Sequence, residues 1–329
     1  MITSVQTPLV EIEDVEKRFG GAGGFLSTAQ PEVKALNKVT LTIDQGDSFC
    51  LVGESGCGKS TLARTVIGLT PPSKGQIRYK GSRIDNLSVK ARRPFARKMQ
   101  MIFQNPYASL NPRMTVLQTL REPLQIHHPE MTLAQIDDKV AAVMASVGND
   151  PSWTSRYPHE FSGGQRQRIS IARALMLDPE FVVADEPISA LDVSIQAQVL
   201  NVMMDAQQDR NLTYLFITHD LSVVEHFGNR VAVMYLGTVC ELADTKDLFA
   251  TPRHPYTQAL LSAVPKIGGH GVNHVKMTGE VPTAMDLPSG CVFHTRCPHA
   301  NDRCAREIPA LRDNGNTQTS CFAVEENRL

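Results

Sequence analysis

A glycine-rich loop in the first fifth of the sequence has the composition of a phosphate-binding site. The loop reads Gly-Glu-Ser-Gly-Cys-Gly-Lys-Ser over 53–60, with Thr61 next, directly after the apolar run 48–52. Glycines let successive backbone N–H groups turn toward phosphate oxygens, and a following helix adds the positive end of its dipole. A lysine here reaches the β- and γ-phosphates of a nucleotide, and the adjacent hydroxyl binds Mg²⁺. The candidate residues are Gly53, Ser55, Gly56, Gly58, Lys59, Ser60 (also for Mg²⁺) and Thr61.

Two carboxylates at the end of another apolar run supply the second element that nucleotide hydrolysis needs. Phe181-Val-Val-Ala is followed by Asp185 and Glu186. We expect Asp185 to contribute to the Mg²⁺ shell and Glu186 to act as general base toward the attacking water. An apolar strand ending in Asp-Glu is also common as a simple strand terminus. The assignment therefore depends on the phosphate-binding loop.

A second anion-binding helix start is indicated by the segment Phe161-Ser-Gly-Gly-Gln-Arg-Gln-Arg168, which precedes a helix expected over 169–177. Ser162, Gly163 and Gly164 would present backbone N–H groups to an anion. One nucleotide cannot occupy both helix starts of a single chain if these lie on different faces. Two anion sites in one chain therefore favour a dimer with shared sites.

Four of the seven cysteines are crowded in the C-terminal tail. In a cytoplasmic chain four such thiols favour a metal over disulfides. The paired C-x₂₋₄-C knuckles typical of zinc are absent, whereas iron–sulfur clusters accept looser spacings of four thiolates. A [4Fe–4S] cluster, zinc and uncoordinated thiols all remain open, with zinc as runner-up to the cluster. The candidate ligands are Cys291, Cys297, Cys304 and Cys321.

The elements that must position these groups are short apolar runs rich in branched residues. Such runs are typical of buried strands, and they alternate here with segments of helical spacing. This alternation predicts an α/β fold with a mainly parallel, helix-covered sheet. The expected strands cover 48–52, 181–184, 214–217 and 230–234, and a helix is expected over 59–68.

Composition and charge exclude several classes of protein. The 329 residues carry 33 Lys and Arg against 34 Asp and Glu, a net charge of −1, so no global positive field is available to bind nucleic acid. No apolar run approaches the roughly 18 to 20 residues that cross a bilayer, and the start has no leader pattern. We therefore expect a cytoplasmic protein. A shift toward Gly, Pro, His and Asn after Pro265 predicts a boundary between domains 1–265 and 266–329.

Together, these motifs resemble those of the ATP-binding subunits of ABC transporters, in which each ATP is sandwiched between one subunit's P-loop and the other's signature segment. The resemblance implies an ABC-type P-loop NTPase domain, with a helical subdomain at about 105–165 and a small loop-rich C-terminal cysteine domain. It implies four further roles. Gln104 matches the Q-loop glutamine that contacts Mg²⁺ and water, and His219 matches the switch histidine at the γ-phosphate. Asp192 matches a residue of the loop that crosses the dimer interface. Phe19 stands where the family has an aromatic residue, often Tyr, that stacks on adenine.

A narrower resemblance is to the ATPases of oligopeptide and dipeptide importers. It is carried by His-Pro-Tyr-Thr-Gln-Ala-Leu-Leu at 254–261 and by Phe-Gln-Asn-Pro-Tyr-Ala-Ser-Leu-Asn-Pro at 103–112. The resemblance implies an energy-coupling ATPase on the cytoplasmic face of the inner membrane. Its implied partners are a second, non-identical ATPase, two integral-membrane permeases and, indirectly, an extracytoplasmic solute-binding protein. Cysteine quartets in this branch are associated with a [4Fe–4S] cluster. The solute is selected on other subunits.

Two other functions would fit part of the sequence. Soluble ABC ATPases of translation carry two cassettes in one chain, and those of DNA repair insert long coiled coils. Only about a hundred residues separate Ser60 from Ser162 here, a span suited to a small helical subdomain. A redox-sensing module would make the cysteine tail the main function. Nothing in the first 265 residues requires that.

Overall fold

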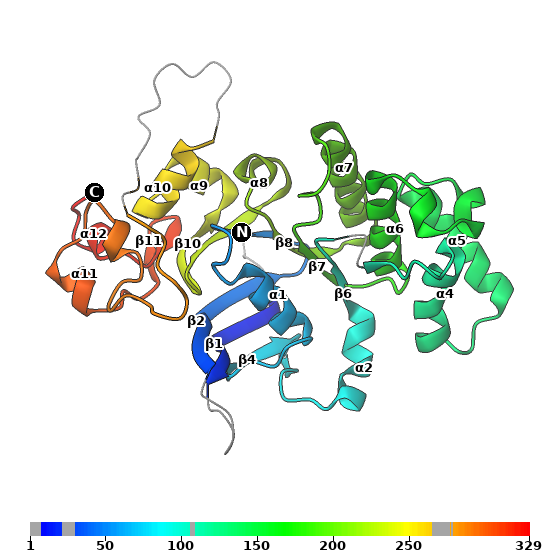
Figure 1. Cartoon of the computed structure of the whole chain (residues 1–329), viewed down its shortest axis with the longest axis horizontal. Coiled ribbons are helices and arrows are strands. Elements are labelled where there is room, and N and C mark those ends of the chain that lie inside the picture. Colours follow the sequence, from blue (N-terminus) through cyan, green and yellow to red (C-terminus); the bar gives the residue numbers. More distant parts are fainter. Residues whose placement is uncertain (1–7, 22–29, 106–108, 265–276, 278) are drawn as a thin grey trace, which may run out of the picture. The chain divides into compact units, whose positions relative to one another are not determined.

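The computed structural model describes residues 8–21, 30–105, 109–264, 277 and 279–329. This part of the chain forms two compact units, whose elements are labelled in Figure 1. The first unit consists of Met1–Asp44, Ser48–Asn86 and Thr218–Leu329, and the second of Gln45–Asp47 and Leu87–Ile217. The predicted domain boundary after Pro265 lies outside the described residues and stays a prediction.

The first unit contains an antiparallel sheet that the sequence analysis did not predict. Its strand order is β2-β1-β4-β5. Register shifts interrupt the long pairing of the first two strands at five places, which breaks the simple alternation of apolar and polar residues. Apolar residues such as Val10, Ile12 and Val39 are nevertheless fully buried. The strands are β1 (Pro8–Gly21), β2 (Gln30–Asp44), β4 (Lys74–Tyr79) and β5 (Ser82–Arg83).

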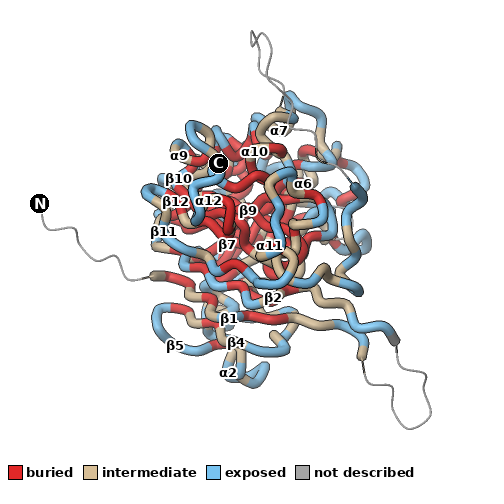
Figure 2. The backbone as a smooth tube through the Cα atoms, turned by 90° about the vertical axis from the view of Figure 1, so that its left-hand side faces the viewer, coloured by how far each residue is buried: buried red, intermediate tan, exposed pale blue. Residues whose placement is uncertain are grey.

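A second set of strands in the first unit carries the predicted runs 48–52 and 230–234. These form β3 (Ser48–Val52) and β9 (Arg230–Tyr235), which pair in parallel, and β9 pairs antiparallel with β10 (Thr238–Asp244). Both predicted strands are confirmed, and Figure 2 shows β9 as buried along most of its length. The helices of this unit before the tail are α1 (Lys59–Ile67), α8 (Leu221–Phe227), α9 (Thr245–Ala250) and α10 (Pro255–Ser262).

The described part of the cysteine tail is joined to a sheet of the first unit, and the predicted loop-rich cysteine domain is not confirmed. Its strands β12 (Thr317–Thr319) and β11 (Arg312–Asn314) extend the sheet beyond β10, and its described residues belong to the first unit. Backbone hydrogen bonds to the sheet of the first unit therefore help to order the tail. The sequence analysis could not foresee this, because the tail has few apolar runs and these hydrogen bonds do not depend on side chains. Its short helices are η3 (His294–Arg296), α11 (Asp302–Arg306) and α12 (Phe322–Glu325).

The second unit combines three parallel strands with a group of helices. The strand order is β8-β7-β6, and the predicted strands at 181–184 and 214–217 are confirmed. Capping boxes at Thr115 and Thr132 begin α4 and α5, which lie within the predicted helical region. The elements are β6 (Met99–Ile102), β7 (Phe181–Asp185), β8 (Thr213–Ile217), α2 (Val89–Lys98), α4 (Val116–His127), α5 (Leu133–Ser146), η1 (Pro151–Ser155), η2 (Pro158–Glu160), α6 (Gly163–Leu175) and α7 (Val193–Arg210).

The helices differ from the central strands in how far they are buried. Across the described ranges, none is long and apolar enough to span a bilayer. The strands β3, β7 and β8 are buried at every residue, whereas the short helix α2 buries none of its side chains. Buried strands with both faces covered read as continuous apolar runs, which is why these three were visible in the sequence.

Candidate functional site

The glycine-rich loop joins β3 to α1, as predicted. Gly58 is the N-cap residue of α1 and has a φ of 104°. A Cβ atom at Gly58 would lie 2.4 Å from the carbonyl oxygen of Ala35. Any other residue would be strained in φ and would collide with this backbone atom. Glycine therefore lets the loop pass close to β2 and present the N-terminus of a helix to an anion.

Lys59 lies inside the loop rather than in solvent. Its side chain is buried, with 4% of the residue exposed. The Nζ atom donates to the carbonyl oxygens of Gly53 at 2.7 Å and Glu54 at 3.0 Å. A buried ammonium needs partners, and phosphate oxygens are stronger acceptors than neutral carbonyls. The amine is thus held where incoming phosphates could replace its present partners, and Ser60 and Thr61 follow it, half-buried, in the first turn of α1.

Two further predicted residues of the first unit are exposed. Phe19 on β1 is 42% exposed, and the Nζ atom of Lys17 lies 5.0 Å from the centre of its ring. An exposed ring keeps a face available for stacking on a base. His219 is also exposed, and the residue before it is anchored because the Thr218 N–H donates to the Leu51 carbonyl at 3.2 Å. The position of His219 is therefore set by β3, the strand that leads into the loop.

The two carboxylates of the second unit differ in environment. Asp185 ends β7 and is 3% exposed, whereas Glu186 is half-buried with a φ of 46°. A non-glycine residue in this left-handed region is uncommon, and such strain clusters at functional sites. The Glu186 N–H donates to the Ile217 carbonyl at 3.0 Å, and Gln104 Nε2 donates to Glu186 Oε2 at 2.9 Å. The fold thus brings together Gln104 and Glu186, which are 82 positions apart.

The signature segment (residues 161–168) is part of a helix, and the predicted helix start at 169 is wrong. Helix α6 begins at Gly163, because Ser162 and Gln165 form a capping box. The Ser162 N–H donates to Gln165 Oε1 at 3.0 Å, which fixes the helix start six residues earlier than the apolar periodicity suggested. Ser162 is exposed and Gly163 half-buried, so the segment lies at the surface.

The first turn of α6 packs closely on the start of α7. A Cβ atom at Gly164 would lie 2.4 Å from Ile195 Cγ2, so this contact leaves no room for a side chain. Asp192 is the N-cap residue of α7 and is exposed. The structure therefore places Ser162 and Asp192 at the starts of two adjoining helices, both accessible from solvent.

The four tail cysteines lie in one neighbourhood of the first unit. Burial, and then the proximity of Cys321, Cys304 and Cys297, raises the pKa of Cys291 to about 12. Burial likewise raises the pKa of Cys297 and of Cys321, and both thiols lie near Cys304. Four thiols fit an iron–sulfur cluster or zinc in type and number. Among the described residues, however, no group of three or more His, Cys, Asp or Glu side chains is arranged to hold a metal ion.

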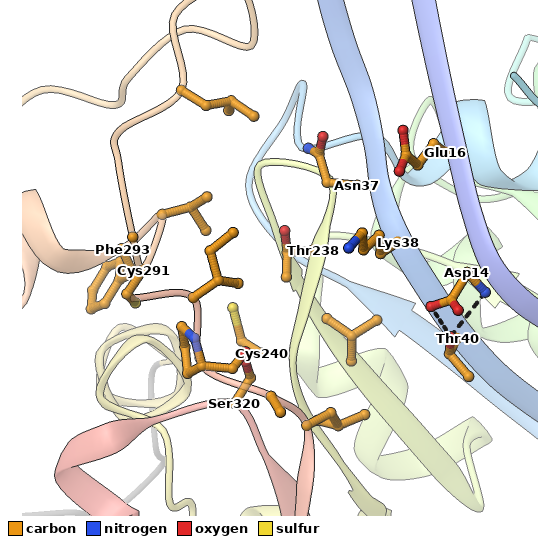
Figure 3. Close-up of a pocket in the computed structure, with 18 of the residues that line it drawn as sticks. Asp14, Glu16, Asn37, Lys38, Thr40, Thr238, Cys240, Cys291, Phe293 and Ser320 are labelled. Carbon is orange, nitrogen blue, oxygen red and sulfur yellow. Dashed lines mark hydrogen bonds between the residues drawn. The ribbon is translucent and has the colours of Figure 1, made fainter. Parts of the chain in front are cut away.

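A cavity of about 1030 Å³ borders this neighbourhood within the first unit. Figure 3 shows Glu16 and Lys38 on the side of β1 and β2, facing Cys240, Cys291 and Phe293 on the other side. Its described lining includes no residue of the glycine-rich loop. The cavity is therefore separate from the predicted phosphate site, and Cys291 is the one of the four tail cysteines that lines it.

Sequence reasoning missed the residues that support the loop from the C-terminal third of the chain. Arg296 Nη1 lies 2.9 Å from Glu54 Oε2, and the Glu54 N–H donates to Tyr256 Oη at 2.9 Å. These partners are 242 and 202 positions apart. The His-Pro-Tyr-Thr segment was visible as a motif, but no local pattern marked its contact with the loop.

Comparisons with known protein families match most of the chain. Residues 36–189 match the family model described as ABC transporter, and residues 240–304 match the model described as oligopeptide/dipeptide transporter, C-terminal region. The first match covers the glycine-rich loop, the signature segment and both carboxylates. The second covers the His-Pro-Tyr-Thr segment and three of the four tail cysteines, as far as Cys304.

Curated relatives are similar over nearly the whole chain. The oligopeptide transport ATP-binding protein AppF of Bacillus subtilis is 50% identical over 317 residues, which cover 95% of this chain and 96% of the relative. The dipeptide transport ATP-binding protein DppF of Escherichia coli is 46% identical, with coverage of 98% and 97%. Among solved structures, the dimeric post-hydrolysis state of the ATP-binding cassette MJ0796 bound to ADP and Pi matches with a TM-score of 0.64 and 25% identity, covering 72% of this chain and 98% of that one.

Proposed function

Because this chain belongs to the family of ATP-binding proteins of oligopeptide and dipeptide ABC transporters, we propose that it powers the import of peptides or related small solutes. ABC-transporter ATP-binding domains hydrolyse ATP, so the chain is an ATPase. The observation that carries the peptide assignment is the match of residues 240–304, because this region lies outside the general ATPase match.

The proposed ATPase chemistry gives each of the predicted site residues a separate task. Backbone N–H groups of the glycine-rich loop and Lys59 bind the β- and γ-phosphates, and Ser60 contributes a ligand to Mg²⁺. Asp185 completes the Mg²⁺ shell, and Glu186 accepts the proton of the attacking water. Gln104 orients the Glu186 carboxylate through the 2.9 Å hydrogen bond and contacts the Mg²⁺ shell. Phe19 stacks on the base, and His219 contacts the γ-phosphate.

The proposed assembly contains two composite ATP sites. Ser162, Gly163, Gly164 and Asp192 of this chain complete the site on a second, homologous ATPase, and the partner's signature completes the site on this chain. The exposure of Ser162 and Asp192 supports a role at an interface. We propose a heterodimer docked on two integral-membrane permeases at the cytoplasmic face of the membrane, with a solute-binding protein on the other side. ATP closes the dimer, and hydrolysis reopens it.

Peptide uptake by cells tests the proposed function directly. Removal of the chain should abolish accumulation of radiolabelled dipeptides or oligopeptides, because the permeases lose their energy source. Wild-type protein should restore uptake, whereas Lys59→Ala should not, and Lys74→Ala serves as the control because that lysine is an exposed partner of Glu16. Unchanged uptake of every peptide length in the deleted strain, with uptake of another solute class lost, would move the assignment away from peptides.

We further propose that the four tail thiols are the ligands of a [4Fe–4S] cluster, with zinc as the alternative metal. The mutual proximity of Cys291, Cys297, Cys304 and Cys321 supports it. A cluster would crosslink the short tail elements and supply one-electron redox chemistry. Metal binding must release the protons of thiols whose pKa is raised, so it should tighten as pH rises.

The cluster proposal predicts a brown protein after anaerobic preparation. About four irons per chain should accompany thiolate-to-iron charge-transfer absorption. Changing any one of the four cysteines to serine should remove both signals, because each supplies one ligand. Cys240→Ala is the matched control, since this buried thiol lies near Cys291 but outside the quartet. A colourless protein with one zinc would assign the site to zinc, and metal-free protein with an ordered tail would exclude a metal.

A further inference from the structure

The glycine-rich loop is fixed at its first non-glycine residue by the C-terminal third of the chain. Glu54 accepts two hydrogen bonds from Arg296, from Nη1 at 2.9 Å and Nη2 at 3.3 Å. The Arg296 side chain is only 8% exposed, and Nη1 also contacts Tyr235 Oη at 3.4 Å. A two-point guanidinium–carboxylate contact fixes orientation as well as distance. The Glu54 side chain therefore has one defined position.

The backbone of Glu54 is held separately from its side chain. Its N–H donates to Tyr256 Oη at 2.9 Å, and its carbonyl accepts from Lys59 Nζ at 3.0 Å. The N–H group is consequently turned toward α10 and not toward a ligand in the loop. Because peptide groups are planar, this hydrogen bond also sets the direction of the Gly53 carbonyl, the other acceptor of Lys59.

The groups that hold Glu54 are themselves rigid. The rings of Tyr235, Tyr256 and Phe293 pack together, with centres 4.8 to 5.4 Å apart. Tyr256 is fully buried, and its N–H donates to His254 Nδ1 at 3.0 Å. Burial lowers the pKa of His254 to about 4, so the imidazole is neutral at pH 7 and can accept this bond. Side chains whose rotamers are fixed by packing hold their hydrogen-bond partners in defined positions.

We infer that Arg296 and Tyr256 are positioning residues for ATP binding, which hold the Glu54 end of the loop in the shape that receives the phosphates. The inference rests on the proposed binding of ATP at this loop. Arg296 acts through Glu54 and does not touch the nucleotide. Because Arg296 is the last residue of η3 and directly precedes Cys297, the folding of the cysteine tail sets the affinity of the loop for ATP.

The affinity for MgATP, measured by calorimetry on the full chain carrying Glu186→Gln to prevent hydrolysis, tests this inference. Arg296→Met and Glu54→Gln should each raise the Kd by about tenfold, the effect typical of a lost charged hydrogen bond. The double variant should be no weaker than the weaker single variant, because both act through one contact. Arg296→Lys should recover part of the affinity. Tyr256→Phe, which keeps the ring packing, should weaken binding severalfold.

Arg303→Met is the matched control, since Arg303 is an ion-paired tail arginine that stacks on Phe322 and pairs with Glu326 instead of the loop. It should change the Kd by less than about twofold. An equal loss of affinity in Arg303→Met, or wild-type affinity in a folded Arg296→Met, would overturn the inference. Lys59→Ala separates this result from the proposed function. If the parent protein with an intact loop binds no MgATP, the proposed function fails. If Lys59→Ala abolishes binding while Arg296→Met and Glu54→Gln leave the Kd unchanged, only the positioning role fails.

Discussion

Glu186→Gln is expected to lower ATP turnover by at least about a hundredfold while MgATP still binds, because a general base contributes 10²–10⁴-fold. The amide has the size of the carboxylate and can still accept the hydrogen bond that Gln104 donates at 2.9 Å, so the local geometry should persist. It cannot accept a proton from water. Steady-state phosphate release by the assembled transporter, together with the Kd for MgATP, measures the two effects separately. Retained ATP should keep the dimer closed.

Glu180→Gln is the matched control for this substitution. Glu180 lies at the opposite end of β7 and pairs with Lys98 at 2.9 Å, so its removal should leave turnover unchanged. Near-normal turnover in Glu186→Gln would remove Glu186 from the role of base. Loss of MgATP binding in the same variant would instead indicate that the carboxylate holds the metal.

Ser162→Arg is expected to abolish hydrolysis on the partner ATPase and to spare the site of its own chain. The signature is proposed to complete the partner's site, where a long cation would displace the donors aimed at the phosphates; loss of one such donor alone costs about 10²–10³ in rate. Photoreactive ATP trapped with vanadate labels each subunit separately. Lys59→Ala should remove the label from this chain, and Ser162→Arg should remove it from the partner.

Thr132→Arg controls for the loss of a helix cap. Thr132 begins α5 with the same kind of capping box as Ser162, so its substitution costs the same cap at a helix start outside the signature segment. Label should persist on both subunits of this variant. If Ser162→Arg removes the label from its own chain and leaves it on the partner, the composite-site proposal is wrong.

The sequence by itself indicated an ATPase and located the central strands. The loop around Lys59 and the pair Asp185-Glu186 were recognisable as motifs because each consists of a few residue types at adjacent positions, and their roles stay predictions. The strands β3, β7, β8 and β9 were identifiable because strands buried on both faces are continuous apolar runs. The start of α6 was misplaced, because the capping box at Ser162 precedes the apolar pattern from which the helix was read.

Only the tertiary structure showed the strand pairings and side-chain contacts that join residues far apart in the sequence. The pairing of β1 with β2 was hidden by its register shifts, and the place of the tail in the sheet of β10 depends on hydrogen bonds that any backbone can make. Gln104 meets Glu186, and Arg296 meets Glu54, across 82 and 242 positions. A side chain's own neighbours in sequence carry no information about such a partner. The packing of buried rings around Tyr256 fixes the contact with the loop, and this packing exists only in the folded chain.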